Sequence, residues 1–507
     1  MHTQEFKGDL GSPSGEATHA SQFSLGPSVS ETFKTWQPIK VDAATEAVAH
    51  PTLNTTQVVD GEKSLTLLGC MLDPLEPQAD DSTILRRLLA KISDPADVLE
   101  ATKRLGGRWI LILRNNDQKF LFIDALGMRQ VFYTDPAHTQ SVWAFSHPKL
   151  AERTLGLTMD DTAQRYMDSY VWRSDPEYRW PVASTPYREV RRLLPNHYLD
   201  LNTGACHRYW PDRPLGRRRL EDAIEEISVL MRGLLKAAAH RFDLAIAVTA
   251  GIDSRLVWAA CKEIRQNVSF ITLRKARDPD NYADFDIPAR LASNLGLDHT
   301  VIKASGTAST EFSGAFKENV FLAHDHYAAD AEAILKQFSR AKVVITGSGG
   351  ETARCYYGSR IPGYRRITPE YLAILDVRGS EFALQHYRGW LEQLGETYGL
   401  DVLDLFYWEN RTAWLAMTAL EFDIAWRDNI TPFNCRDVLT TMLAVNERYR
   451  EPPDYQLFRR LIGRIWPELL SEPFNPHLTN PRTRFKELLK MTVKHAVITA
   501  RRVLPRH

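Results

Sequence analysis

The chain has 507 residues, of which 44% are hydrophobic and 25% charged, and Lys plus Arg equals Asp plus Glu at 63 each. This length predicts about two or three domains, and the balanced charge argues against a nucleic-acid partner. The five cysteines form no CxxC pair, which argues against a disulfide framework and a Cys-rich zinc site and favours a cytoplasmic protein.

The first part of the chain has the pattern of an α+β domain. Residues 1–30 are rich in small and polar side chains, which predicts a flexible tail. Residues 31–210 are predicted to form a domain with antiparallel strands that ends in a proline-rich linker. The expected strands are 64–69, 108–114, 119–124, 130–133 and 142–146, and the expected helices are 83–92 and 94–105.

The second part, residues 211–480, alternates strands and helices. Expected strands are 244–248, 268–273, 299–302 and 341–346, and expected helices are 221–242, 256–264, 287–295 and 329–339. This alternation predicts a doubly wound parallel sheet, with mainly helical structure after residue 365. Residues 481–507 predict a basic amphipathic helix, which either meets a membrane surface or an acidic protein or packs on the body of the molecule.

A loop of small residues between an apolar strand and an apolar helix is the most informative local pattern. The loop consists of Thr249, Ala250, Gly251, Ile252, Asp253 and Ser254. Backbone N–H groups and the helix dipole at such a junction form an anion site, and small side chains let a phosphate approach closely. Asp253 stands where a phosphate-bound Mg²⁺ needs a carboxylate. An ordinary strand-to-helix turn is the alternative interpretation.

A second small-residue loop follows the predicted strand 341–346. It consists of Gly347, Ser348, Gly349 and Gly350, and Glu351 comes next. Ligands of open α/β sheets bind at the carboxyl ends of the strands, so the two loops predict one shared site. Asp253 and Glu351 would hold the same Mg²⁺, with Thr272 and Leu273 on the neighbouring strand as further nucleotide contacts.

Together these features resemble the asparagine synthetase family. The first loop resembles the Ser-Gly-Gly-x-Asp-Ser loop of ATP pyrophosphatases, and the second resembles Ser-Gly-Glu-Gly-Ala-Asp-Glu, with Glu351 at the position of the metal-binding Asp. Residues 106–113, 122–133, 144–146 and 428–437 resemble further family segments. The resemblance implies an N-terminal glutaminase-like domain of the Ntn-hydrolase type, a PP-loop ATP-pyrophosphatase domain, and ATP and Mg²⁺ as cofactors.

The sequence departs from the family at its catalytic positions. The nucleophilic cysteine expected at residue 2 is His2, so the glutaminase is expected to be dead, as in the similar β-lactam synthetase and lasso-peptide cyclase. The family's catalytic Glu falls on Ser348, for which Glu409 and Tyr407 are candidate substitutes. Its transition-state lysine has no clear counterpart, and Lys486, Arg482 and Arg484 are the candidate replacements.

The resemblance therefore implies a ligase that adenylates a substrate carboxylate and joins it to an amine that does not come from glutamine. The substrates are expected to be small molecules or a peptide, and a homodimer is a further expectation. A non-catalytic homologue that binds nucleotide or a partner is the alternative, favoured by Ser348 and the missing lysine. A tRNA-modifying enzyme with a similar loop is disfavoured because no basic or Cys-paired RNA module is present.

Overall fold

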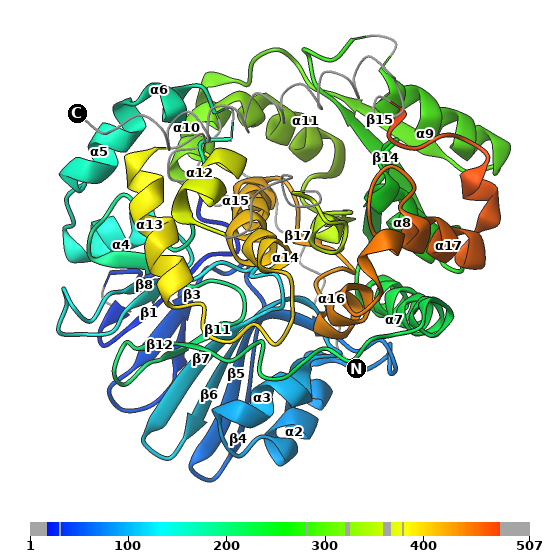
Figure 1. The fold of residues 1–507 in the computed structure, drawn as a ribbon. Coiled ribbons are helices and arrows are strands. Elements are labelled where there is room, and N and C mark those ends of the chain that lie inside the picture. The colour runs from blue at the N-terminus through cyan, green and yellow to red at the C-terminus, as the bar shows by residue number, and fades with distance from the viewer. Residues whose placement is uncertain are drawn as a thin grey trace, which may run out of the picture.

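The computed structural model describes residues 18–29, 32–175, 177–279, 282–319, 325–357, 367–377 and 380–476. An N-terminal part built on two antiparallel sheets is followed by a part built around a parallel sheet with many helices (Figure 1). The predicted helix 481–507 lies outside the described residues, as do Lys486, Arg482 and Arg484. Within the described ranges, no helix combines the length and apolar character needed to cross a membrane.

Each antiparallel sheet has six strands. The first sheet has the order β10-β8-β9-β1-β3-β2, with β1 Phe23–Gly26, β2 Gln37–Lys40, β3 Glu46–Ala49, β8 Phe132–Thr134, β9 Ala144–Phe145 and β10 Val190–Arg192. The second has the order β12-β11-β7-β6-β5-β4, with β4 Thr55–Asp60, β5 Lys63–Leu72, β6 Gly106–Asn115, β7 Gln118–Ile123, β11 His197–Asp200 and β12 Cys206–Arg208. The β6–β7 hairpin confirms the pair of strands expected on either side of residues 115–118.

Strand β6 shows why the two sheets stack. Successive side chains of a strand point to opposite faces, and Ile110 and Ile112 enter the core shared with the first sheet. Trp109 and Leu111 instead contact the apolar sides of α2 (Asp81–Lys91) and α3 (Pro95–Thr102), which cover the outer face of the second sheet.

The expected flexible tail 1–30 is wrong for residues 23–26. These residues form β1, which is buried in the first sheet and pairs with β3 and β9. Phe23 and Leu25 enter the inter-sheet core, while a Cβ added to Gly26 would lie 2.1 Å from the Trp143 ring. Only two large apolar residues alternate with Ser24 and Gly26, which is too weak a pattern to distinguish from a polar tail. Residues 1–17 are outside the described chain.

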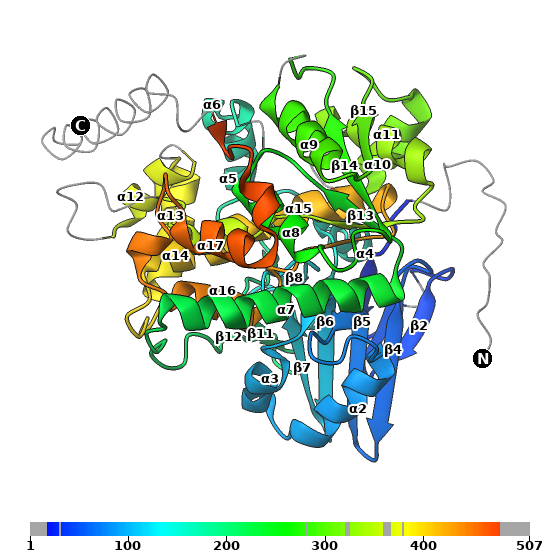
Figure 2. The same cartoon turned by 90° about the vertical axis from the view of Figure 1, so that its right-hand side faces the viewer.

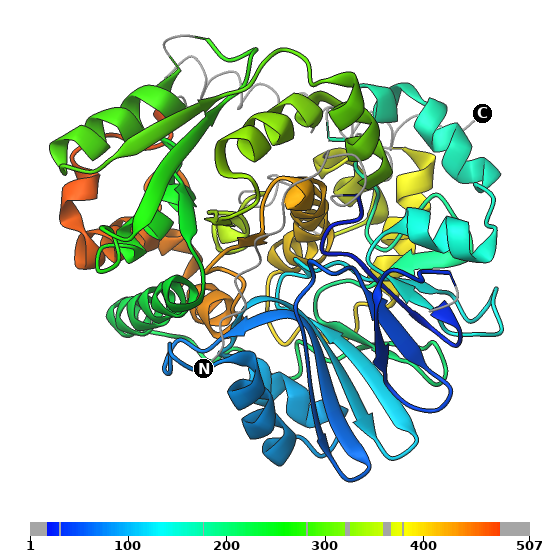
Figure 3. The ribbon, with the colours of Figure 1, turned by 180° about the vertical axis from the view of Figure 1, so that it is seen from behind.

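The parallel sheet confirms the expected doubly wound architecture. Its order is β15-β14-β13-β16-β17, with every neighbouring pair parallel. The strands are β13 Leu244–Ala247, β14 Val268–Arg274, β15 His299–Lys303, β16 Val343–Ile345 and β17 Asp428–Ile430. The last strand is not expected from the sequence, because three residues carry no periodic signal. Helices lie on both faces of the sheet (Figure 3).

One face of this sheet packs on α7 Leu220–Arg241, α8 Ile252–Ala260, α9 Ala283–Asn294 and α17 Gln456–Ile465. The other packs on α10 Thr310–Asn319 and α11 Ala328–Phe338. The remaining helices are α4 Pro148–Leu155, α5 Asp161–Asp168, α6 Tyr170–Arg173, α12 Pro369–Leu375, α13 Glu381–Glu392, α14 Val402–Phe406, α15 Thr412–Glu421 and α16 Arg436–Leu443. Residues Tyr407–Arg411 form a π-helical turn between α14 and α15. The helical prediction for the described residues after 365 is thus confirmed.

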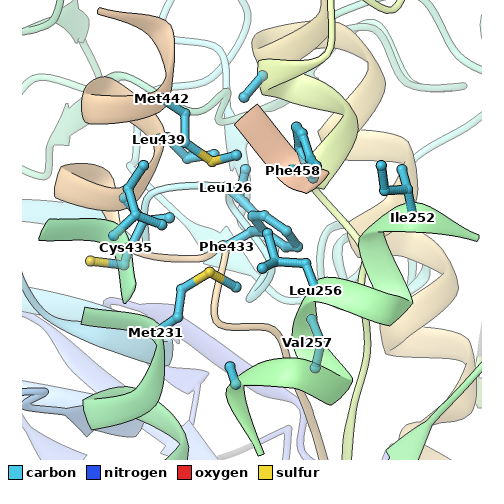
Figure 4. Close-up of a cluster of buried hydrophobic side chains, with 14 of the residues drawn as sticks. Leu126, Met231, Ile252, Leu256, Val257, Phe433, Cys435, Leu439, Met442 and Phe458 are labelled. Carbon is cyan, nitrogen blue, oxygen red and sulfur yellow. The ribbon is translucent and has the colours of Figure 1, made fainter. Parts of the chain in front are cut away.

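The two parts of the chain share a buried interface. Helix α7 runs between the antiparallel sheets and the helices of the second part (Figure 2). Arg108 forms a bidentate ion pair with Asp423, at 2.6 and 3.0 Å, and also contacts Asp428. Leu126, from the turn after β7, joins the core of the second part beside Phe433 (Figure 4). The interface therefore fixes the N-terminal part against the parallel sheet.

Candidate functional site

The two predicted loops lie at the point where the winding of the parallel sheet reverses. From β13 the chain adds β14 and β15 on one side, then crosses to add β16 on the other side. In open α/β sheets the crevice at the carboxyl ends of such neighbouring strands is the usual ligand site. The first loop follows β13 and the second follows β16, and these two strands are neighbours in the sheet. The strand order therefore places the two loops side by side, as expected.

Glycines of the second loop allow the two loops to touch. A Cβ added at Gly347 would lie 2.7 Å from the Ser254 nitrogen, and one added at Gly350 would lie 2.6 Å from Asp253 Oδ1. Any side chain at either position would push the loops apart. The small residues therefore serve the close approach of one loop to the other, whatever ligand they bind.

Hydroxyl groups make the first loop rigid. The Thr249 and Ser254 hydroxyls are 2.8 Å apart, and the Gly251 N–H donates to Thr249 Oγ1. The Ala250 N–H donates to Asp284 Oδ1 at 2.9 Å, a contact that the sequence does not indicate. Helix α8 then begins without a side-chain cap, so the N–H groups of its first turn are the candidate anion donors. Ile252 contributes only backbone there, since its side chain is in the core (Figure 4).

The two predicted metal ligands lie around one guanidinium group, that of Arg354. Its Nη2 is 2.9 Å from Asp253 Oδ2 and 3.5 Å from Glu351 Oε1. The other oxygens of the pair, Asp253 Oδ1 and Glu351 Oε2, are buried without a hydrogen-bond partner among the described residues. Burial raises the pKa of the Asp253 carboxyl to about 7, with Arg354 lowering it and Glu351 raising it further. The two carboxylates thus share Arg354 as a single counter-ion.

These residues fit a magnesium ion that arrives with a phosphate ligand. Mg²⁺ prefers oxygen ligands and is commonly held by one or two carboxylates plus substrate phosphates. The unpartnered oxygens of Asp253 and Glu351 supply that donor set. In the described part of the chain, no group of three or more His, Cys, Asp or Glu residues could hold a metal by itself.

Thr272 and Leu273 lie near the carboxyl end of β14, beside the first loop. The Thr272 hydroxyl is buried, donates to the Val248 carbonyl at 2.7 Å, and lies 2.8 Å from His299 Nε2. Leu273 is partly buried against the cluster on the α10–α11 face. Thr272 is thus next to the first loop, but its hydroxyl is already engaged within the sheet.

The structure corrects the choice of Glu409 as a candidate general base. Glu409 is fully buried and forms a salt bridge with Arg208 of β12, and its oxygens also accept from Asn196 Nδ2 and Trp390 Nε1. Arg208, the nearby His197 and these hydrogen bonds outweigh the burial and lower its pKa. Glu409 is thus an ionised carboxylate whose oxygens are all hydrogen-bonded, and it links the two parts of the chain. It is therefore removed from the candidate bases.

Ser348 stays at the site but has no activating partner there. Its hydroxyl accepts from Thr346 at 3.2 Å, and its carbonyl accepts from Thr431. No described histidine or carboxylate forms a hydrogen bond with that hydroxyl. An unactivated serine is a poor base at neutral pH, so phosphate or substrate binding suits Ser348 better than proton transfer.

Tyrosines form one wall near the second carboxylate. Tyr407 packs on Tyr356 with ring centroids 4.6 Å apart, and Tyr357 lies 6.0 Å from Tyr407. Burial and then the charge of Glu351 raise the pKa of the Tyr407 phenol well above its usual value. Tyr407 begins the π-helical turn, a distortion that is frequent at functional sites. Tyr407 therefore remains a candidate, whereas Glu409, two residues later, does not.

The sequence patterns do not reveal two residues at this site. Arg354 follows Glu351 by three residues, and a search of the turn after the second loop for charge partners could have found it. Asn475 donates its N–H to the Ala250 carbonyl at 3.0 Å, while its Nδ2 is buried without a partner among the described residues. Arg255, which directly follows Ser254, turns away from the loop and binds the carbonyls of Leu469, Glu472 and Pro473.

No family model matches the chain, and no curated protein does. Among solved structures, it is similar to glutamine phosphoribosylpyrophosphate (PRPP) amidotransferase from B. subtilis complexed with ADP and GMP. That match has 11% identity and a TM-score of 0.26, and covers 67% of this chain and 73% of the other. A structure of the allosteric regulatory enzyme of purine biosynthesis matches at 10% identity and a TM-score of 0.24, with coverage of 63% and 74%. Such low scores support no inference about the site.

Proposed function

We propose that the chain is an AMP-forming, ATP-dependent carbon–nitrogen ligase similar to the asparagine synthetase family. One observation carries the proposal. Two small-residue loops from β13 and β16 touch at the switch point of a parallel sheet. The first contains, and the second is followed by, a carboxylate with one buried oxygen that has no hydrogen-bond partner among the described residues. This is the arrangement that a nucleotide's Mg²⁺-bound phosphates require, because it combines backbone donors with oxygen ligands for the ion.

In this proposal ATP lies over the first loop, with its β- and γ-phosphates at the N-terminus of α8. Asp253 and Glu351 would hold Mg²⁺, which when bound neutralises charge that grows on the departing pyrophosphate. A substrate carboxylate oxygen bonds to the α-phosphorus as the bond to pyrophosphate breaks, which gives an acyl-adenylate. The amine nitrogen then bonds to the acyl carbon, the bond from that carbon to the AMP oxygen breaks, and the amine proton passes to solvent.

The amine is proposed to come from a second substrate or from the same molecule, not from glutamine. The N-terminal part is proposed to be of the Ntn-hydrolase type, because its two stacked antiparallel sheets have helices on their outer faces. A glutaminase of that type needs a cysteine at the start of the first strand, whereas β1 is preceded by Ser21 and Gln22. Cys70 is buried in β5, and burial raises the pKa of its thiol to about 12. A peptide or natural-product ligase that uses an amine of its own substrate fits this domain.

A non-catalytic nucleotide-binding role is the second candidate, and two observations favour it. Glu409 is buried in an ion pair with Arg208 and cannot act as a base, and no described base contacts the Ser348 hydroxyl. A protein with this site but no group to take the amine proton would bind Mg²⁺–ATP without completing amide formation.

An ATP–pyrophosphate exchange assay over a panel of carboxylates tests the proposal. The wild type should exchange with at least one carboxylate, and Asp253→Ala should lower the rate roughly 100-fold or more, the scale seen when a group that stabilises transition-state charge is lost. Asp298→Ala, a change of an exposed acid, serves as the control and should leave the exchange rate unchanged. Exchange that survives in Asp253→Ala refutes the assigned role, and ATP binding without exchange for any carboxylate favours the second candidate.

A further inference from the structure

Arg354 is the cation that contacts both candidate metal ligands. It follows the helical turn Gly350–Ala353 at the end of the second loop, and its guanidinium lies between Asp253 and Glu351. The side chain is 13% exposed and packs over the Tyr455 ring, 5.4 Å from its centroid. One residue thus connects carboxylates that follow two different strands, one at the start of α8 and one in the turn after the second loop.

An ordinary structural ion pair does not account for the hydrogen bonding of this cluster. Arg354 Nε is a buried donor without a partner among the described residues, and Asp253 Oδ1 and Glu351 Oε2 are buried acceptors without one. Buried polar groups are nearly always satisfied, because leaving one unsatisfied costs stability. Donors and acceptors that stay unpaired within one cluster indicate a ligand that carries both a cation and anionic oxygens.

A phosphate-bound divalent cation is the ligand class that satisfies all three atoms. Asp253 Oδ1 and Glu351 Oε2 would hold the ion, and Arg354 Nε would donate to a phosphate oxygen. Asn475 Nδ2, beside the first loop, is a fourth unpartnered group that would donate to the same ligand. Two carboxylates and one guanidinium leave a net charge of −1, which a divalent cation turns into +1 facing the polyphosphate.

We propose that Arg354 is the phosphate-binding arginine of this site and its counter-ion while the nucleotide is absent. Without ligand, the guanidinium compensates Asp253 and Glu351. With a Mg²⁺-bound pyrophosphate group present, Asp253 and Glu351 would hold the ion, and Arg354 would be free to hold the phosphate through a charge-assisted hydrogen bond. The inference rests on the proposed function, and it adds a binding residue that is absent from the loops predicted from sequence.

Titration calorimetry on the full chain, with Mn²⁺ alone and with Mg²⁺–pyrophosphate as probes, tests the inference. Arg354→Met should weaken pyrophosphate binding about 10- to 100-fold, the range expected for one lost charge-assisted hydrogen bond. The same variant should bind Mn²⁺ alone more tightly, because Asp253 and Glu351 have lost the counter-ion that they share. Arg354→Lys keeps the charge without Nε, so its pyrophosphate affinity should be intermediate. It serves as the test if the Met variant does not fold.

The opposite results overturn the inference. If Arg354→Met binds both probes more tightly, the arginine only competes with the metal, and if neither affinity changes, it is a structural ion pair. Asp253→Ala separates this failure from that of the proposed function. Pyrophosphate binding that is lost in Asp253→Ala but kept in Arg354→Met overturns the role of Arg354 alone. If the wild type does not bind Mg²⁺–pyrophosphate, both proposals fail.

Discussion

Replacing Gly350 by alanine tests whether the contact between the two loops positions the candidate metal ligand. The added Cβ would lie 2.6 Å from Asp253 Oδ1 and 2.9 Å from its Cγ, which is about 0.8 Å short of ordinary contact at 3.4 Å. Phe433 Cε2 lies 3.0 Å away on another side, so the new methyl group cannot retreat without a second clash. The Asp253 carboxylate has to move instead.

We expect Gly350→Ala to cost about 1–3 kcal/mol of stability, as for other overpacked cores. A displacement near 1 Å lowers the activity of a preorganised site by about 100-fold, so exchange and Mg²⁺–pyrophosphate affinity should fall far more than stability does. Calorimetry and denaturant unfolding measure the two effects. Gly389→Ala is the matched control, because it lies in α13 with no atom within 4 Å of the added Cβ. Pyrophosphate affinity within twofold of wild type in Gly350→Ala would refute the reasoning.

Three further predictions concern the interface and pH. Arg108→Met should destabilise the protein by about 3–5 kcal/mol in denaturant unfolding, because it leaves Asp423 buried without its partner. The control Arg173→Met removes an exposed ion pair and should cost about 1 kcal/mol or less. Equal losses of stability in the two variants would contradict the prediction. Glu409→Gln should lower stability because it leaves Arg208 without its ion-pair partner, while the folded variant keeps its affinity for Mg²⁺–pyrophosphate. Unchanged stability together with a loss of ATP–pyrophosphate exchange would restore Glu409 as a catalytic candidate. Burial lowers the pKa of His386 from 6.5 to about 4, so the unfolded chain takes up a proton at a higher pH than the folded protein does, and stability is lost as pH falls below 6.5. The free energy of unfolding of His386→Gln should therefore gain roughly 2 kcal/mol relative to wild type between pH 7 and pH 5. A difference between the two proteins that stays constant with pH would exclude this coupling.

The site loops could be predicted because their signals are local. A short apolar strand, small residues and a helix start are contiguous in the sequence around Gly251, and the rule for parallel strands brings the second loop to the same edge. Nothing local identifies β1, whose burial depends on β3 and β9 pairing with it from elsewhere in the chain.

The partners of charged residues are the least predictable feature. Glu409 resembles an accessible acid in an apolar segment, yet its partner Arg208 is 201 residues away along the chain. Arg354 escapes prediction for the converse reason, because its position next to Asp253 depends on the contact between the two loops. A sequence identifies which residue types are available at a site, but the fold decides whether a charge faces a ligand or another side chain.

The N-terminal part also has a physical role in the proposed site that requires no glutaminase chemistry. Gly349 of the second loop has a positive φ of 89°, and a Cβ added there would lie 2.4 Å from Leu126 Cδ1. Leu126 is fixed in turn, because its N–H donates to Asn434 Oδ1 and the neighbouring Ala125 carbonyl accepts from Trp408 Nε1. The turn after β7 thus supports the loop that carries Glu351. Losing the N-terminal part would therefore remove a support of the proposed site, whether or not that part has an activity of its own.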